Sequence, residues 1–385
     1  MYITYHIILD QDLFDTMTDY ISARDAAESW GISQRRVSAL CSQGRIPESK
    51  IIGNSWMIPA NSKKPDDARS RYFSESNDRL KPFIKWAGGK GQLVDQISSM
   101  YPSELGKSIK KYAEPFIGGG AILFNILSRF SLKEVYISDI NRELIRTYVA
   151  IRDDPDTLIE NLNQYQDEFI KLDEDEKKQY FYVKRSRFNE LIDDRSDEFV
   201  DECAALFIFL NKTCFNGLYR VNSSGHFNVP FGRYKNPLIC DVNNILTVSK
   251  KLQNVSIING NFRESFDFID SETFVYFDPP YRPLSETANF NSYSGEFNDD
   301  SQRDLAAYCR EINDKGAKFA LSNSDPKNTD LNDNFFDDLY AGFNIMRLKA
   351  NRMINSNGEN RGVISEILVT NYVSKSKQIQ KTLDE

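Results

Sequence analysis

The chain has 385 residues, a formal net charge of −8 and 40% hydrophobic residues, which is typical of a globular protein with two or three domains. It contains no run of eighteen apolar residues, and its N-terminus lacks the basic region of a signal peptide. Five widely spaced cysteines without a Cys-x-x-Cys pair indicate reduced thiols and argue against disulfides or structural zinc. We therefore expect a cytoplasmic protein that contacts no membrane and holds no metal ion.

The chain opens with an unassigned extension, residues 1–18, in which Met17 is an alternative start to Met1. A small domain is predicted over residues 19–60, because signals for two short helices and a hairpin follow one another there. A capping box at Ser22-Ala23-Arg24-Asp25 is expected to start the first of these helices.

The second helix of this domain is predicted over Gln34–Gln43, after a turn at Gly31-Ile32-Ser33, and a hairpin is predicted over Lys50–Ile58. This pattern resembles the winged helix-turn-helix domains of the excisionase and MerR-like type. The resemblance places Arg35 and Arg36 near the start of the recognition helix, where such domains touch DNA bases. A helical protein-interaction module is the alternative.

The remainder of the chain begins after a polar linker at residues 61–80 and is predicted to be an α/β domain. Apolar strand-like runs alternate there with amphipathic helical stretches, which implies a parallel or mostly parallel sheet covered on both faces. Residues 151–254 are too many for a connection, so they are predicted to be a subdomain inserted between residues 81–150 and 255–375, ahead of a tail at residues 376–385. The predicted strands are Lys111–Phe116, Glu134–Asp139, Val255–Asn259, Thr273–Phe277, Lys318–Ser322, Phe343–Leu348 and Glu366–Asn371.

A glycine-rich loop, Glu114-Pro115-Phe116-Ile117-Gly118-Gly119-Gly120, follows a predicted strand and opens a helix. Glycines in such a loop permit a tight turn and a close approach to a ligand. Asp139 ends the next strand, where a carboxylate can accept both hydroxyls of a ribose. The order of strand, loop, helix, strand and acid predicts a site for an adenosine cofactor, whereas the missing three-glycine and phosphate-loop motifs disfavour a dinucleotide or an ATPase.

Charge is unevenly distributed within the predicted insert. Residues 153–202 contain 17 acidic and 7 basic residues, whereas residues 203–240 contain four basic residues and no acidic one. A local field steers a polyanion more than net charge does, so the second stretch is a candidate nucleic-acid surface. Acidic helices that merely flank a neutral core segment are the alternative.

Asp278-Pro279-Pro280-Tyr281 directly follows the apolar run Phe274–Phe277, at the end of a predicted strand where open α/β sheets bind ligands. The prolines fix their φ angles and donate no N–H, but their carbonyls remain acceptors. The segment therefore offers a carboxylate, a carbonyl and an aromatic face to a planar substrate with an amino group. The alternative is a Pro-Pro turn that Asp278 merely caps.

From Lys81 to Tyr372 the chain resembles the Dam-type DNA adenine methyltransferases, the α class (D12 family) of amino-methyltransferases that use S-adenosylmethionine (AdoMet). The glycine loop precedes the Asp-Pro-Pro-Tyr motif with an insert between them, which is the motif order of that class. The resemblance implies a Rossmann-like methyltransferase fold in which residues 151–254 recognise the target. The matching stretches are Phe83–Lys90, Glu114–Gly120, Asp139–Asn141, Asn216–Arg220, Phe227–Lys235, Asp278–Tyr281 and Ala288–Phe290.

The resemblance implies a cofactor site around the glycine loop. Trp86 and Lys90 are expected at the methionine end of AdoMet, Asp139 at the ribose and Phe262 near the adenine. The cofactor-binding residues that it implies are Trp86, Lys90, Gly118, Gly120, Asp139, Phe262 and Asp278.

The catalytic residues implied are Asp278, Pro279 and Tyr281. Asp278 and the Pro279 carbonyl would accept the two N–H bonds of the target amine, which turns its lone pair toward the methyl donor. Such catalysis is positioning and electrostatics without a covalent enzyme intermediate. Tyr281 would stack on an adenine that leaves the duplex at a cost of a few kcal/mol.

DNA contacts are implied for the acid-free stretch. Phe215 and Asn216 would fill the space of the flipped base, and Arg220 would bind a guanine edge, worth about 1–3 kcal/mol of discrimination. Lys85 would contact the other guanine, and Tyr234 the adjoining backbone or base. The resemblance suggests GATC as the site, although Phe215 stands where many relatives carry tyrosine. Phosphate contacts by Arg220 are the alternative.

The sequence thus predicts a site-specific DNA (adenine-N6)-methyltransferase whose partners are double-stranded DNA and, as a further candidate, a restriction endonuclease of the same specificity. An N4-cytosine methyltransferase, which usually carries serine in place of Asp278, is one alternative. A DNA-binding regulator with a silent methyltransferase fold is another. Asn323 and the segment Arg352–Arg361 are predicted to line a DNA channel.

Overall fold

A computed structural model describes residues 20–65 except 31, 33, 43 and 54, together with residues 80–194, 198–282, 297–351 and 363–373. None of the helices in these ranges combines the length and the apolar character that crossing a bilayer requires. Some predicted features lie outside the described residues. They are the extension 1–18, Gly31 and Ser33 of the turn, residues 66–79 of the linker, Ala288–Phe290, Arg352–Arg361 and the tail 376–385.

The chain divides into two compact units, and the first comprises Met1–Ser76 with Asp153–Thr157. In it, the Asp25 N–H donates to Ser22 Oγ at 3.2 Å and the Ser22 N–H donates to Asp25 Oδ2 at 3.3 Å, which confirms the capping box. The predicted helices and hairpin are present, while their identity as a DNA-binding helix-turn-helix stays a prediction. The elements are β1 (Tyr20–Ser22), α2 (Ala23–Trp30), α3 (Gln34–Ser42), β2 (Lys50–Ile52) and β3 (Ser55–Pro59), with the antiparallel sheet order β1-β3-β2.

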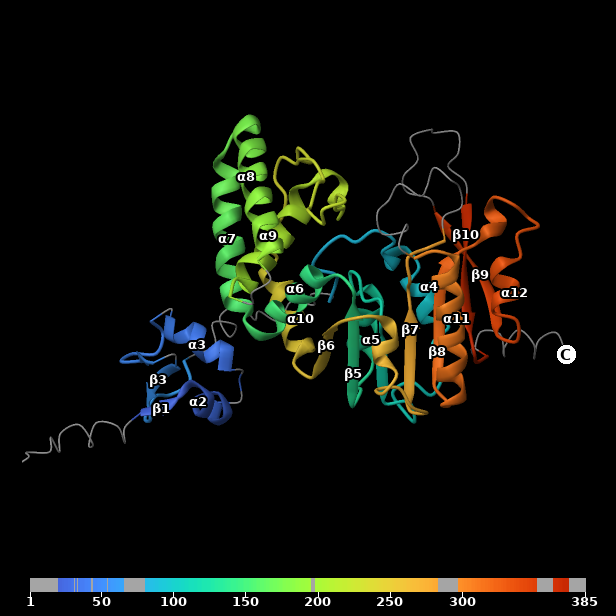
Figure 1. Cartoon of the computed structure of the whole chain (residues 1–385), viewed down its shortest axis with the longest axis horizontal. Coiled ribbons are helices and arrows are strands. Elements are labelled where there is room, and N and C mark those ends of the chain that lie inside the picture. Colours follow the sequence, from blue (N-terminus) through green and yellow to red (C-terminus); the bar gives the residue numbers. More distant parts are fainter. Residues whose placement is uncertain are drawn as a thin grey trace, which may run out of the picture. The chain divides into compact units, whose positions relative to one another are not determined.

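The second unit, Asn77–Arg152 with Leu158–Glu385, contains a seven-stranded sheet in the order β6-β5-β4-β7-β8-β10-β9 (Figure 1). The first five strands in that order run parallel, and β10 pairs antiparallel with β8 and β9. All seven predicted strands are present, and the mostly parallel sheet is confirmed. The strands are β4 (Lys111–Glu114), β5 (Glu134–Asp139), β6 (Val255–Asn259), β7 (Thr273–Phe277), β8 (Lys318–Ser324), β9 (Asn344–Asn351) and β10 (Val363–Thr370).

Helices cover both faces of this sheet. They are α4 (Val94–Ser98), α5 (Ala121–Arg129), α6 (Arg142–Asp153), α11 (Asp299–Asp314) and α12 (Phe335–Leu339). In β7, Phe274 and Tyr276 join the hydrophobic core that contains α5 and α6, whereas Val275 and Phe277 join the core that contains α11 and α12. Successive side chains of a strand point to opposite faces, so a continuous apolar run such as β7 needs cover on both sides.

Residues 151–254 are mainly helical. Helix α6 continues to Asp153, past the predicted boundary at residue 150, because its apolar face, including Ile151, stays buried in the core. The interpretation of this region as a separate target-recognition subdomain stays a prediction. Its elements are α7 (Pro155–Lys171), α8 (Glu174–Asp193), α9 (Val200–Thr213), the 3₁₀ turn η3 (Phe215–Gly217) and α10 (Val242–Leu252).

Candidate active site

Three neighbouring parallel strands end at the same edge of the larger sheet and carry the predicted chemistry. Strand β4 leads into the glycine loop, β5 ends at Asp139, and β7 is followed by Asp278. Because β4 lies between β5 and β7 and all three run parallel, their carboxyl ends are adjacent. Ligands of open α/β sheets bind at this edge.

Gly118 and Gly120 occupy positions that other residues do not fit. Their φ angles are 45° and 72°, in the left-handed region where a Cβ is strained. A Cβ on Gly118 would lie 2.7 Å from Trp86 Cδ1, and one on Gly120 would lie 2.5 Å from the Tyr148 hydroxyl oxygen. That hydroxyl also donates to the Gly118 carbonyl at 3.0 Å. The loop is therefore a tightly held main-chain cradle.

Asp139 faces this cradle from the end of β5. Its Oδ2 accepts the Gly118 N–H at 3.2 Å, and its Oδ1 accepts the Asn141 N–H at 2.9 Å. The residue is only 8% exposed, and burial raises the pKa of its carboxyl to about 6, although the backbone N–H groups oppose that rise. At pH 7 the group is therefore mainly a carboxylate with lone pairs left for a hydroxyl donor.

Phe262 lies directly beyond β6, in the 3₁₀ turn η4 (Phe262–Ser265). Its ring stacks on Phe116 with centroids 5.5 Å apart and an interplanar angle of 27°, and it is 4% exposed. Phe116 belongs to the glycine-loop stretch, so this aromatic pair links the strand ends on either side of β5.

Asp278, Lys90 and Tyr281 meet beyond β7. Lys90 Nζ lies 2.7 Å from Asp278 Oδ1 and donates to the Gly88 carbonyl at 2.8 Å. The same Nζ is 4.5 Å from the centroid of the Tyr281 ring, and the Lys90 side chain is 3% exposed. Burial raises the pKa of the Asp278 carboxyl, and the Lys90 ammonium opposes that rise. The lysine that the sequence assigned to the cofactor therefore also holds the predicted catalytic acid.

Two further carboxyl groups at this edge were not predicted. The Tyr281 hydroxyl donates to Glu366 Oε2 on β10. Glu114, 2% exposed, accepts the Tyr112 hydroxyl at 2.6 Å, and burial together with the Asp278 charge raises the pKa of Glu114 well above its usual range. Glu114 stands in a stretch that matches the family, and Glu366 is an acid within a predicted apolar strand, so both left a signal in the sequence.

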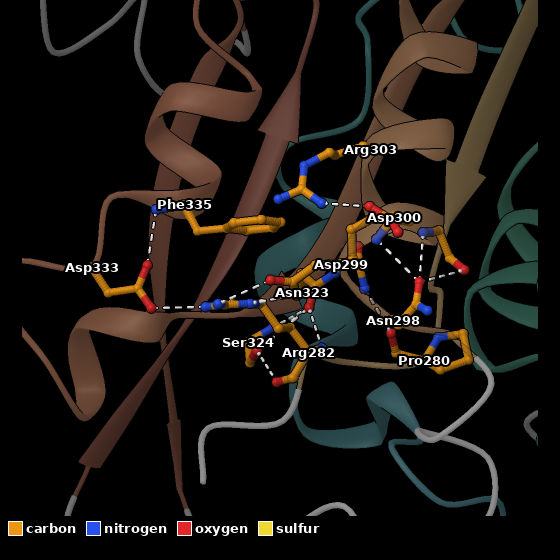
Figure 2. Close-up of polar contacts among 12 residues, drawn as sticks. Pro280, Arg282, Asn298, Asp299, Asp300, Arg303, Asn323, Ser324, Asp333 and Phe335 are labelled. Atoms are coloured by element: carbon orange, nitrogen blue, oxygen red, sulfur yellow. Dashed lines mark hydrogen bonds and ion pairs between the residues drawn. The ribbon is translucent and has the colours of Figure 1, made fainter. Parts of the chain in front are cut away.

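Arg282, directly after Tyr281, is held in place by its side-chain contacts (Figure 2). Its guanidinium donates to Asp299 at 2.8 Å and to Asp333 at 2.7 Å and lies 4.3 Å from the Phe335 ring centroid. Its backbone N–H donates to Asn323 Oδ1 at 3.2 Å. The prediction that Asn323 follows a strand and lines a DNA channel is wrong, because Asn323 lies within β8 and is fully buried. Its amide serves internal hydrogen bonds instead.

The residues predicted to enter DNA lie on and after η3. Phe215 and Asn216 are exposed, Phe215 at 52%, and Asn216 has a left-handed φ of 57°. Arg220 is exposed, and its Nε donates to Asn228 Oδ1 at 2.7 Å. An exposed ring and an exposed arginine on one loop supply both the stacking and the charge that nucleic acids require.

Lys85 and Tyr234 adjoin this loop, with Lys85 Nζ 5.6 Å from the centroid of the Tyr234 ring. Asn211, for which no role was predicted, connects Lys85 to η3. The Lys85 N–H donates to Asn211 Oδ1 at 2.9 Å, and Asn211 Nδ2 donates to the carbonyls of Lys85 at 2.8 Å and Gly217 at 3.0 Å. The predicted DNA contacts Lys85, Phe215 and Asn216 are therefore parts of one hydrogen-bonded structure.

Trp86 connects the two predicted sites. Its ring stacks on Tyr219 with centroids 5.6 Å apart and an interplanar angle of 21°, and it also crowds Gly118 of the loop. Tyr219 directly precedes Arg220 in the chain. Across the described ranges, no group of three His, Cys, Asp or Glu residues is placed to bind a metal ion.

Arg35 and Arg36 belong to the other unit, at the start of α3. Arg36 is buried, and its guanidinium pairs with Asp154 and Asp156 of the same unit. The two carboxylates occupy donors of Arg36 in this structure, and its predicted base contact stays a prediction. Arg35 is half-buried, and its predicted DNA contact stays a prediction.

Comparison with known proteins identifies the larger unit. The family model described as D12 class N6 adenine-specific DNA methyltransferase matches residues 86–354. The Type II methyltransferase M.MjaIII of Methanocaldococcus jannaschii is 50% identical over 296 residues, which cover 76% of this chain and 99% of that protein. M1.LlaDCHI, a Type II methyltransferase of Lactococcus lactis subsp. cremoris, is 39% identical, with 76% and 96% covered.

A DNA adenine methylase of Haemophilus influenzae is 33% identical over 290 residues, which cover 75% of this chain and 92% of that protein. The family match spans more than two thirds of the chain and includes the ends of β4, β5 and β7. The chain therefore belongs to the D12 class N6 adenine-specific DNA methyltransferases.

Proposed function

We propose that this enzyme binds AdoMet at the edge formed by β4, β5 and β7 and methylates an adenine flipped out of double-stranded DNA at Asp278. Membership of the family supplies the reaction class and implies the methyl donor. The observation that carries the residue assignment is the ion pair of Asp278 with the buried Lys90, beside the glycine loop.

The residues of this edge fit AdoMet. Trp86 and Tyr148 leave no room for a Cβ at Gly118 and Gly120, which holds the loop in one backbone conformation beside Asp139. The Asp139 carboxylate would accept the ribose hydroxyls, and Phe262 and Trp86 offer apolar surfaces to the two ends of the molecule. When bound, AdoMet supplies an electrophilic methyl group on a positively charged sulfur.

The chain's own contribution at the reacting centre is to hold the amine. Asp278 accepts one N–H and the Pro279 carbonyl accepts the other, which fixes the nitrogen with its lone pair directed at the methyl carbon. Tyr281 stacks on the base, with its ring anchored through the hydroxyl bond to Glu366. These effects are positioning and preorganised electrostatics.

The recognition surface that we propose is the η3 loop with Lys85, Arg220 and Tyr234. Phe215 keeps half of its surface exposed next to a strained Asn216, a costly arrangement that DNA insertion would explain. GATC is the proposed site, and a restriction endonuclease of the same specificity is the proposed partner. The Type II names of two relatives support that partner.

Transfer of tritiated methyl groups to duplexes with and without GATC tests the chemistry and the target. Asp278→Ala is expected to lower the rate at saturating substrates by about 10²–10³-fold, because a positioned acceptor is lost. The matched control Asp314→Ala removes an exposed carboxylate from the end of α11 and should transfer at the wild-type rate. Equal rates for wild type and Asp278→Ala would refute the catalytic assignment, and equal labelling of both duplexes would refute GATC alone.

Arg220→Ala tests base reading against phosphate contact. If Arg220 reads guanine, the variant loses about 1–3 kcal/mol of discrimination at one base pair of the site. If it binds phosphate, affinity falls equally for all duplexes, and the slope of log Kd against log salt falls by about 1. Competition binding with single-substituted duplexes measures both, and Lys107→Ala removes an exposed charge outside this stretch as control.

A further inference from the structure

The proposed catalytic segment, Asp278–Arg282, contains residues that cannot donate main-chain hydrogen bonds. Two consecutive prolines, Pro279 and Pro280, remove two backbone N–H donors directly after Asp278. Without these N–H groups the segment cannot be held by a regular pattern of main-chain hydrogen bonds. Side chains from other elements therefore have to orient its carbonyl groups. If the Pro279 carbonyl is to accept an N–H of the substrate, its peptide plane has to be held at the right angle.

Buried amide side chains provide this anchor. Gln302 Nε2 on α11 donates to the Pro280 carbonyl at 3.1 Å. Asn323 Nδ2 on β8 donates to Gln302 Oε1 at 3.1 Å. Both Gln302 and Asn323 are fully buried, so their orientation is set by these bonds and not by water.

The other end of the segment is fixed by the same strand. The Arg282 N–H donates to Asn323 Oδ1 at 3.2 Å, and the Ser324 hydroxyl donates to the Arg282 carbonyl at 2.9 Å. Asn323 therefore serves both ends, because its Nδ2 orients Gln302 while its Oδ1 holds Arg282. This amide relay, Asn323 to Gln302 to the Pro280 carbonyl, spans the residues that follow Asp278.

We propose that Gln302 and Asn323 are positioning residues for methyl transfer, which act by fixing the peptide plane between Pro280 and Tyr281. Because the ring of Pro280 locks its φ, fixing this plane also limits the orientation of the preceding peptide, which carries the Pro279 carbonyl. The proposal rests on the proposed function, because it presumes that Asp278 and the Pro279 carbonyl grip the target amine. Neither amide touches the amine or the methyl donor. Their effect is on the angle of the acceptor, and a displacement of about 1 Å at a reacting centre is enough to cost about 100-fold in rate.

Single-turnover methyl transfer to duplex DNA with saturating AdoMet tests the relay. Gln302→Leu removes both bonds of Gln302 and is expected to slow transfer about 10- to 100-fold, while the Kd values for AdoMet and DNA change less than about threefold. Asn313→Leu is the matched control, because Asn313 accepts an amide hydrogen bond from Asn371 at 3.0 Å near the other end of the same helix. It should transfer at the wild-type rate.

Gln302→Glu gives a second test, the pH dependence of the methyl-transfer rate, which a purely structural role of Gln302 would leave unchanged. A neutral glutamic acid keeps both bonds, since its O–H donates to the Pro280 carbonyl and its C=O accepts from Asn323. A carboxylate loses the donor and faces the carbonyl with a negative charge. Burial raises a carboxyl pKa, so the rate of this variant relative to wild type at the same pH should rise as the pH is lowered. Circular dichroism confirms that each protein stays folded over the range.

Each outcome of these methyl-transfer experiments either supports or overturns the proposal. A wild-type rate for Gln302→Leu, a loss confined to the Kd values, or an equal loss in Asn313→Leu overturns the proposal. If Gln302→Leu does not fold, the pH profile of Gln302→Glu decides instead, and a profile parallel to wild type overturns it. Asp278→Ala, measured in parallel, separates the positioning role of Gln302 and Asn323 from the catalytic role of Asp278. An inactive Asp278→Ala beside a fully active Gln302→Leu refutes the relay alone, whereas an active Asp278→Ala refutes the proposed function beneath it.

Discussion

At the scale of single residues, several acidic side chains lie near one buried lysine ammonium, that of Lys90. Lys90 pairs with Asp278, while Glu114 and Glu366 stand close enough to raise the pKa of neighbouring groups. Two charged carboxylates beside one buried ammonium would leave an uncompensated charge, which is costly in a low-dielectric site. The raised pKa of Glu114 eases this conflict, because burial and the Asp278 charge favour the neutral form of Glu114 and leave the Lys90 charge to Asp278.

If Asp139 binds the ribose of AdoMet as proposed, AdoMet binding should depend on pH. Its pKa of about 6 means that the carboxylate is protonated as the pH falls from 7 to 5, which removes an acceptor for the ribose hydroxyls. Titration calorimetry should therefore show the Kd for AdoMet rising by up to about tenfold over that range. Asp139→Asn should bind weakly with little pH dependence.

Asp278→Asn is the control for this experiment, because the pKa of Asp278 is also raised. If the Asp139 assignment is right, Asp278→Asn keeps the wild-type pH dependence. A flat profile in wild type, or a profile lost in Asp278→Asn but kept in Asp139→Asn, would contradict it.

At the scale of elements, function depends on where strands end. Strands β4, β5 and β7 are buried on both faces, so their side chains serve the two cores and only the residues beyond their carboxyl ends are free for chemistry. The glycine loop turns back tightly there because Gly120 starts α5 with a left-handed φ.

Gly120→Ala tests the loop. The substitution places a non-glycine residue at a positive φ and a Cβ 2.5 Å from the Tyr148 hydroxyl oxygen. Because both are destabilising, we expect the free energy of unfolding to fall by at least about 2 kcal/mol. Gly225→Ala is the matched control, since Gly225 has a φ of 80° but no atom within 4 Å of the added Cβ. It should lose only about 1 kcal/mol in urea unfolding. Equal losses would show that crowding at Gly120 is unimportant.

At the scale of the whole molecule, the chain carries a small unit with helices α2 and α3 and a β-sheet in addition to its methyltransferase unit. Its charge favours DNA, since residues 19–64 contain 7 basic and 4 acidic residues in a chain of net charge −8. A basic module that neutralises phosphates adds affinity without adding chemistry. We therefore expect this unit to change DNA affinity and leave the methyl-transfer rate unchanged.

Arg35→Ala tests this expectation. If Arg35 contacts phosphate, the slope of log Kd against log salt should fall by about 1, while single-turnover transfer at saturating DNA stays at the wild-type rate. Arg24→Ala removes the same charge from an exposed position on α2 and should leave the slope unchanged. The same slope for wild type and Arg35→Ala would argue instead for a protein-interaction module.

The strands, the mostly parallel sheet and, apart from Glu114 and Glu366, the polar residues at its carboxyl edge could be predicted from the sequence. These features are predicted by local patterns in the sequence, namely apolar runs, a glycine-rich loop and the consecutive prolines beyond β7. Family membership then decided between the two target bases and excluded a silent scaffold. The partners of Lys90 and Tyr281 could not be predicted, because Asp278 and Glu366 are distant in the chain.

The sequence by itself determined the motifs, their order and hence the reaction class of this protein. Only the tertiary structure decided which polar residues serve the fold and which face a ligand. Arg36 and Asn323 were expected at DNA, yet one is ion-paired and the other fully buried. The physical reason is that a polar side chain has the same local signature in both settings, and its desolvation and its long-range partners exist only once the chain has folded.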